Sequence, residues 1–143
     1  MNDEVVVAVS GYFDPMHVGH LEYLQLASKL GDKLIVIVNN NHQAELKKGE
    51  FFMHEKDRME IVAALKCVDE VFLSIDKDKS VSKTIQKIYN ELKNEFELFF
   101  ANGGDQDNSS ILESKVCKEL NIKMIDGIGS KIQSSSWLLN TNL

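Results

Sequence analysis

Short, continuously apolar runs alternate with helix-length amphipathic segments along this chain, and this alternation constrains its fold more than any other feature. The first run, residues 5–10, is rich in valine and stays apolar until its last residue, which is typical of a strand buried on both faces. The first helical segment ends before Gly31, a residue that favours a helix stop. By the same reasoning we expect strands at residues 5–10, 33–38, 68–74, 97–101 and 122–125, and helices at 18–30, 54–65, 80–93, 111–120 and 134–139.

This alternation predicts an α/β fold, namely a Rossmann-like open parallel five-stranded sheet with helices on both faces. The chain has 143 residues and shows no repeat, low-complexity tract or linker, so we expect a single domain over residues 1–143. In such a sheet, ligands bind beyond the carboxyl ends of the strands. That rule places four segments around one crevice: residues 10–20, 39–53, 102–108 and 127–136.

Charge and cysteine content narrow the range of partners. The net charge of −6 disfavours extended contact with nucleic acid or an anionic membrane surface. No apolar run approaches the roughly 20 residues of a membrane span, and the acidic residues Asp3 and Glu4 do not fit a secretory signal. Cys67 and Cys117 have no metal-ligand spacing, so we expect reduced thiols in a cytoplasmic protein.

The segment between the first strand and the first helix carries the clearest chemical signal. A strand that turns through Gly11 into a helix N-terminus offers backbone N–H groups and the positive end of the helix dipole to an anion. His17 and His20 lie on one face of the first helical turn, and Gly19 between them lets a ligand approach the backbone. We interpret this arrangement as a site for a phosphate chain; the alternative is a pair of solvated polar residues.

Four charged residues near this segment each have two interpretations. Asp14 either orients a histidine or helps to hold a hydrated Mg²⁺, and the alternative is a turn hydrogen bond alone. Lys47 and Lys48 offer flexible positive charge to a phosphate, although adjacent lysines are commonly a solvated surface. Arg58, the only arginine of the chain, suits two-pronged binding of a phosphate or carboxylate; its alternative is a surface ion pair with a neighbouring glutamate.

The third and fourth loops add further polar residues. Gly104 lets the backbone approach a ligand, and Asp105 can accept a hydrogen bond from a ribose hydroxyl or a base amine; a plain glycine turn is the alternative. The hydroxyls of Ser134, Ser135 and Ser136 stand where the last helix is expected to begin. There they either donate to phosphate oxygens or only cap the helix.

Together these segments resemble the cytidylyltransferase-like nucleotidyltransferases, the superfamily with a His-x-Gly-His motif, over nearly the whole chain. The stretch GYFDPMHVGH at residues 11–20 matches the family's opening motif, and Asp57 and Arg58 followed by VDEV at 68–71 match its middle block. Within the superfamily, the chain resembles the glycerol-3-phosphate cytidylyltransferases and the adenylyltransferases of heptose 1-phosphate. The family's last motif appears as GSKIQSSS at residues 129–136, where the family arginine is missing and Lys131 is expected to replace its charge.

The resemblance implies an enzyme in which a phosphorylated alcohol or sugar attacks the α-phosphate of a nucleoside triphosphate and pyrophosphate leaves. It implies that His17 and His20 stabilise the α-phosphate and the transition state. The full assignment is His17, His20, Lys47 and Arg58 in catalysis, Gly11, Tyr12, Phe13, Asp14, Gly19, Gly104, Asp105, Ser134, Ser135 and Ser136 on the nucleotide, and Lys47, Lys48, Arg58 and Lys131 on the acceptor.

Cofactor and substrate choice follow from the same resemblance. Mg²⁺ is expected to bind through the triphosphate and not in a dedicated protein site, with Asp14 as the one candidate ligand. Relatives are commonly dimers, which implies a homodimer. CTP is narrowly preferred as the donor because the single short domain resembles the glycerol-3-phosphate enzymes. The GGD loop at residues 103–105 favours instead ATP and a sugar 1-phosphate.

Two other classes of protein compete with this reading. A non-catalytic nucleotide-binding module would keep the pocket as a sensor, but the histidines, the lysines and Arg58 are all present. A Rossmann-type dehydrogenase is disfavoured because the first turn lacks Gly-x-Gly-x-x-Gly.

Overall fold

Five parallel strands form one sheet in the computed structural model, which describes residues 4–92, 96–103 and 108–128. The strand order is β3-β2-β1-β4-β5, so β1 lies in the middle and the order of the strands reverses beside it. The strands are β1 (Glu4–Gly11), β2 (Lys33–Val38), β3 (Glu70–Leu73), β4 (Phe96–Gly103) and β5 (Lys123–Ile128). The helices are α1 (Val18–Ser28), α2 (Asn41–Lys48), α3 (Glu55–Ala63), α4 (Ser82–Leu92) and α5 (Asn108–Glu119). The prediction of a Rossmann-like parallel five-stranded sheet is confirmed.

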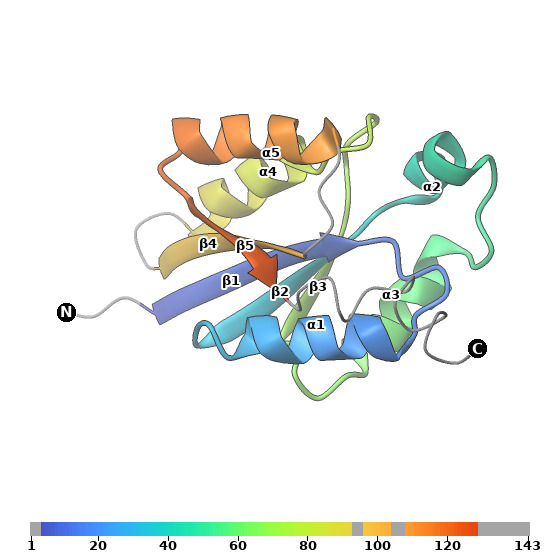
Figure 1. Cartoon of the computed structure of the whole chain (residues 1–143), viewed down its shortest axis with the longest axis horizontal. Coiled ribbons are helices and arrows are strands. Elements are labelled where there is room, and N and C mark those ends of the chain that lie inside the picture. Colours follow the sequence, from blue (N-terminus) through green and yellow to red (C-terminus); the bar gives the residue numbers. More distant parts are fainter. Residues whose placement is uncertain (1–3, 93–95, 104–107, 129–143) are drawn as a thin grey trace.

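Different helices cover the two faces of the sheet, with α4 and α5 on one face and α1 and α3 on the other (Figure 1). In β1, Val6 belongs to a buried cluster that includes Ile85 of α4, whereas the next residue, Val7, belongs to a cluster that includes Leu24 of α1. Successive side chains of a strand point to opposite faces, so a strand that is apolar at every position is buried on both. The valine run therefore accounts for the position of β1 at the centre of the fold.

Helix α2 is the main departure from the sequence expectation, which treats residues 39–53 as a loop. The segment is polar and lacks the apolar period that marks most helices. Local residues nevertheless define both ends of the helix. The side chains of Asn40 and Gln43 form a capping box at its N-terminus, and Gly49 ends it with a φ of +88°. Local capping signals, and not an amphipathic pattern, form this helix.

The other expected elements within the described ranges are confirmed, with their ends shifted by a few residues. The largest extensions are at the start of α5, which begins at Asn108, and at the end of β5, which continues to Ile128. The helix expected at residues 134–139 lies outside the described part of the chain. Cys67 and Cys117 are free thiols. Over the residues that are described, none of the helices has both the length and the apolar character needed to cross a bilayer.

Candidate active site

The loop from β1 to α1 is held by a close contact between Gly11 and Phe13. Phe13 has a φ of +52°, a conformation that is unfavourable for a bulky residue, and its side chain is 1% exposed. A Cβ atom on Gly11 would lie only 2.6 Å from the Phe13 ring, so position 11 requires glycine. The Phe13 ring packs in the core beneath the loop, and a contact of Phe13 with the nucleotide stays a prediction.

His17 and His20 together form the N-terminal cap of α1. The Nδ1 atom of His17 accepts a hydrogen bond from the backbone N–H of Gly19 at 3.0 Å, and Nδ1 of His20 accepts one from the N–H of His17 at 3.1 Å. The two rings stack with their centroids 3.9 Å apart and their planes at 24°. A neutral imidazole whose Nδ1 accepts must carry its proton on Nε2. The cap thus sets the tautomer of both rings and makes each Nε2–H a hydrogen-bond donor.

The pKa of His20 is lowered to about 4, chiefly by burial and further by the neighbouring His17. At neutral pH the His20 ring is therefore uncharged and keeps the Nε2–H tautomer that its cap requires. The Phe13 ring meets it edge-on at 5.2 Å and supports its orientation. The ring is therefore a neutral Nε2–H donor, a group that can stabilise negative charge without the solvation cost of a buried cation.

Asp14 connects the first loop to the segment that follows α2. Its side chain is 0% exposed, and its carboxylate accepts hydrogen bonds from Lys48 Nζ at 2.8 Å and from the backbone N–H groups of Phe52 and Met53 at 2.8 and 2.6 Å. Burial by itself would raise the pKa of Asp14, but these hydrogen bonds outweigh it and the net pKa is lowered. The oxygens of Asp14 thus bond the protein itself, and a contact with the nucleotide, a histidine or Mg²⁺ stays a prediction.

Lys47 and Lys48 both contact the first loop, as the crevice rule predicts for segments 39–53 and 10–20. Lys47 Nζ lies 4.6 Å from the centre of the Tyr12 ring, and Lys48 Nζ bonds the carboxylate of Asp14 and also its backbone carbonyl, at 3.0 Å. Lys47 is exposed, and the Lys48 side chain keeps 37% of its surface exposed. Two ammonium groups therefore lie beside the histidine loop and remain within reach of solvent.

Arg58 has a different environment from the one expected. It is 0% exposed, and its guanidinium donates to the backbone carbonyls of Met53, Tyr12 and Asn39 and to the Asn41 side chain, at 2.6–2.9 Å. Burial lowers the pKa of Arg58. Four of the five N–H donors of the guanidinium are used in these bonds. The alternative of a surface ion pair is wrong, because Arg58 is buried. Binding of the acceptor phosphate by Arg58 stays a prediction.

Arg58 and Asn41 instead hold the parts of the site together. Arg58 joins the first loop, the end of β2 and the segment before α3. Asn41 and Glu55 exchange two hydrogen bonds between backbone N–H groups and side-chain oxygens, at 2.7 and 2.9 Å, which ties the start of α2 to the start of α3. Sequence reasoning missed Asn41, and the only local signal for it is the capping sequence around Asn40.

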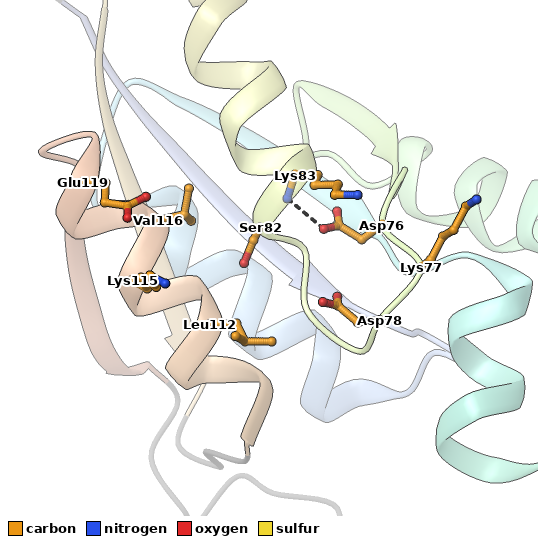
Figure 2. Close-up of a pocket in the computed structure, with 9 residues that line it drawn as sticks. All are labelled: Asp76, Lys77, Asp78, Ser82, Lys83, Leu112, Lys115, Val116 and Glu119. Carbon is orange, nitrogen blue, oxygen red and sulfur yellow. Dashed lines mark hydrogen bonds between the residues drawn. The ribbon is translucent and has the colours of Figure 1, made fainter.

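Several predicted site residues lie outside the described part of the chain: Gly104, Asp105, Lys131, Ser134, Ser135 and Ser136. Gly19 is described and is buried in the first turn of α1, where its N–H is taken up by the His17 cap. An open groove of about 500 Å³ lies elsewhere, between α5 and the segment that leads into the first turn of α4 (Figure 2). None of the residues that line it belongs to the predicted site.

The comparisons with known proteins agree on one family. Residues 8–132 match the family model described as Cytidylyltransferase-like. The chain is 37% identical over 120 residues to an FAD synthase of Methanothermus fervidus, which covers 82% of this chain and 74% of the relative. It is 33% identical over 121 residues to the bifunctional protein HldE of Helicobacter pylori strain P12, covering 83% of this chain but only 24% of that protein. The chain thus spans about a quarter of the length of HldE.

A solved structure has the same fold. The lipopolysaccharide core biosynthesis protein from Thermoplasma volcanium superimposes with a TM-score of 0.67 at 28% sequence identity, covering 86% of this chain and 95% of that protein. The similarity therefore extends over nearly the full length of a protein of comparable size.

Proposed function

The chain belongs to the cytidylyltransferase-like family, and we propose that it transfers a nucleoside monophosphate from a nucleoside triphosphate to a phosphorylated small molecule, with release of pyrophosphate. The observation that carries this proposal is the paired-histidine cap. It presents two Nε2–H donors at the carboxyl end of β1, beside the point where the strand order reverses. Open α/β sheets bind their ligands at such a point.

The residues support an in-line transfer without a covalent enzyme intermediate. An oxygen of the acceptor phosphate forms a new bond to the α-phosphorus, and the bond from that phosphorus to the oxygen bridging to the β-phosphate breaks. The attacking oxygen is already ionised near pH 7, so no general base is needed. His17 and His20 would donate from Nε2 to the α-phosphate oxygens as charge develops there, which is catalysis by alignment and electrostatic stabilisation.

The two lysines fit the role of acceptor binding. Lys47 and Lys48 lie on the same side of the first loop and bring positive charge to a chain of net charge −6. A phosphate within reach of both would draw Lys48 away from Asp14 in part, because lysine is a flexible point charge. We propose Ser134, Ser135 and Ser136 for the β- and γ-phosphates, Gly104 and Asp105 for the nucleoside, and Lys131 as a further acceptor contact.

Mg²⁺ would enter as part of the triphosphate substrate. Within the described ranges, no group of three or more histidine, cysteine or acidic side chains is placed to hold a metal ion. Asp14 does not fit the role, because its carboxylate is buried and already accepts three hydrogen bonds. The phosphate oxygens of the nucleotide, and not protein side chains, would therefore coordinate the ion.

The relatives guide the choice of substrates. FAD contains an adenylyl group, and the chain is 37% identical to an FAD synthase over 74% of that relative, so we propose ATP as the donor to test first. CTP, which the sequence narrowly favours, is the second candidate. The similarity to a lipopolysaccharide core biosynthesis protein favours a sugar phosphate as the acceptor. A homodimer and a cytoplasmic location stay predictions.

The proposal is tested by pyrophosphate release. Purified protein with Mg²⁺ and either ATP or CTP is assayed against a panel of glycerol 3-phosphate, heptose 1-phosphate and FMN. Release that depends on one acceptor, and that falls sharply in His17→Asn, supports the proposal. A protein that ATP or CTP stabilises against heat, but that releases no pyrophosphate with any acceptor, would be a non-catalytic binding module instead.

A further inference from the structure

Helix α2 carries both lysines, but little apolar packing holds it in place. Gln43 and Ala44 are its two buried residues, and the helix lies beyond the carboxyl ends of the strands (Figure 1). Hydrophobic burial cannot be the main force that positions so polar a segment. Gln43 is 0% exposed, which is unusual for glutamine and requires that its amide be fully hydrogen-bonded.

The Gln43 amide uses its whole hydrogen-bonding capacity. Its Oε1 accepts from the Asn39 side chain at 3.1 Å and from the backbone N–H of Asn40 at 3.0 Å. Its Nε2 donates to the backbone carbonyls of Asp78 at 2.6 Å and Ser80 at 2.7 Å. A primary amide has two N–H donors and two acceptor lone pairs, so all four are satisfied.

Asn40 extends the same contact along the chain. Its Nδ2 donates to the backbone carbonyls of Ser74 at 2.9 Å and Asp76 at 3.0 Å, while its Oδ1 accepts from the N–H of Gln43. The two amides therefore bind four alternate carbonyls of one segment: Ser74, Asp76, Asp78 and Ser80. The segment is irregular, with bends at residues 77–80, and the four carbonyls are those that accept from the two amides. The start of α2 thus docks on the segment between β3 and α4.

The segment between β3 and α4 is itself held in place by hydrogen bonds to α4. The Asp76 carboxylate accepts from the backbone N–H groups of Lys83 and Thr84 and from the Thr84 hydroxyl, at 2.6–3.0 Å. The segment is thus tied to the first turn of α4, and Figure 2 shows the bond from Lys83. Gln43 and Lys47 are four residues apart and lie on the same face of α2, one turn from each other. In a helix of only eight residues, fixing Gln43 fixes the backbone under both lysines.

We propose that Gln43 is a positioning residue, which holds α2 on the segment between β3 and α4 and so places Lys47 and Lys48 beside the histidine loop. This inference rests on the proposed function only in giving the lysines an acceptor phosphate to bind. Gln43 touches none of the expected substrates. Its influence would act through the placement of the ammonium groups.

The test uses Gln43→Met, which keeps the approximate volume of the side chain and removes all four hydrogen bonds. KM is measured with whichever of glycerol 3-phosphate, heptose 1-phosphate and FMN the wild-type protein turns over fastest. We expect this KM to rise roughly tenfold, since misplacing groups by the loss of buried hydrogen bonds costs on the order of 1–2 kcal/mol. The KM of the nucleotide and kcat should change less than about threefold. His42→Ala, an exposed position on the same helix, is the matched control and should leave all three unchanged.

Amide hydrogen exchange of residues 41–48 provides a readout that needs no activity. Exchange should accelerate in Gln43→Met and not in His42→Ala. If Gln43→Met does not fold, Asn40→Ser replaces it, because serine keeps the helix cap and loses only the two bonds to Ser74 and Asp76.

Unchanged exchange in a folded variant would overturn the inference, as would a rise in the nucleotide KM in place of the acceptor KM. A wild-type protein without transferase activity would refute the proposed function alone. In that case, amide hydrogen exchange of residues 41–48 would still show whether Gln43 holds α2 in place.

Discussion

The Nδ1 atoms of His17 and His20 both face backbone N–H groups of the α1 N-terminus, and their rings stack 3.9 Å apart. One pair of side chains thus caps a helix and aligns two Nε2–H donors. The same hydrogen bonds that cap the helix also select the Nε2–H tautomer, which the proposed catalytic role requires. Mutations at these positions can separate the two roles.

His17→Asn should reduce activity with little loss of stability. Asparagine is a favoured N-cap residue and can accept from the N–H of Gly19, but it has no equivalent of Nε2. We expect kcat to fall roughly 10²–10³-fold, the scale for losing one preorganised donor. The free energy of unfolding should change by less than about 0.5 kcal/mol, measured by urea denaturation. His17→Ala, which loses the cap as well, should be destabilised by about 1 kcal/mol. Near-wild-type kcat in the asparagine variant would remove His17 from catalysis.

Stability should fall as the pH drops from about 6.5 to about 4 because of His20. Its pKa in the folded protein is about 4, below the ordinary 6.5, so the unfolded state binds more protons in this window. Urea denaturation at pH 7 and pH 4.5 should show a loss on the order of 1–3 kcal/mol. His20→Gln keeps a side chain that can complete the cap and does not titrate, so its loss should be smaller. Asp14 does not interfere, because its pKa is lowered below 3.8 and its contribution is lost only under more acidic conditions. Equal losses of unfolding free energy in the wild type and in His20→Gln would show that the lowered pKa of His20 is not the cause.

Arg58→Met should affect stability more than substrate binding. The substitution removes the donor to the backbone carbonyls of Met53, Tyr12 and Asn39, and it leaves the Asn41 side-chain oxygen with only the Glu55 N–H. We expect a loss of about 3–5 kcal/mol in the free energy of unfolding. Arg58→Lys should not restore it, because lysine lacks the planar array of donors. Lys47→Ala is the comparison: it should unfold like the wild type and mainly raise the KM of the acceptor. A stable Arg58→Met protein with a raised acceptor KM would instead return Arg58 to phosphate binding.

Asp14 and Lys48 should be energetically coupled. The carboxylate is buried and the ammonium is partly exposed, with 2.8 Å between Oδ2 and Nζ. A double-mutant cycle with Asp14→Asn and Lys48→Met should give a coupling of about 1 kcal/mol in the free energy of unfolding. Asp14→Asn alone should cost more than Lys48→Met alone, because Asp14 also accepts from the backbone of Phe52 and Met53. A coupling near zero would show that the ion pair does not contribute to the placement of α2.

The sequence by itself determined the sheet and the first loop. Valine runs such as residues 5–10 are apolar at every position, and only a strand covered on both faces buries them all. The spacing of His17 and His20 places both rings on one helical turn wherever the helix lies. Patterns of this kind are local, so they can be read along the chain.

Only the tertiary structure decided what the charged residues near that loop do. An arginine or an aspartate can equally bind a phosphate, a metal or the backbone, and the choice depends on partners that are remote in sequence. Arg58 bonds Tyr12, 46 residues away, and Asp14 bonds Met53, 39 residues away. Gln43 reaches Ser80 across 37 residues. Burial by such distant segments removes these groups from water and commits their hydrogen bonds to the protein, and no local pattern reports it.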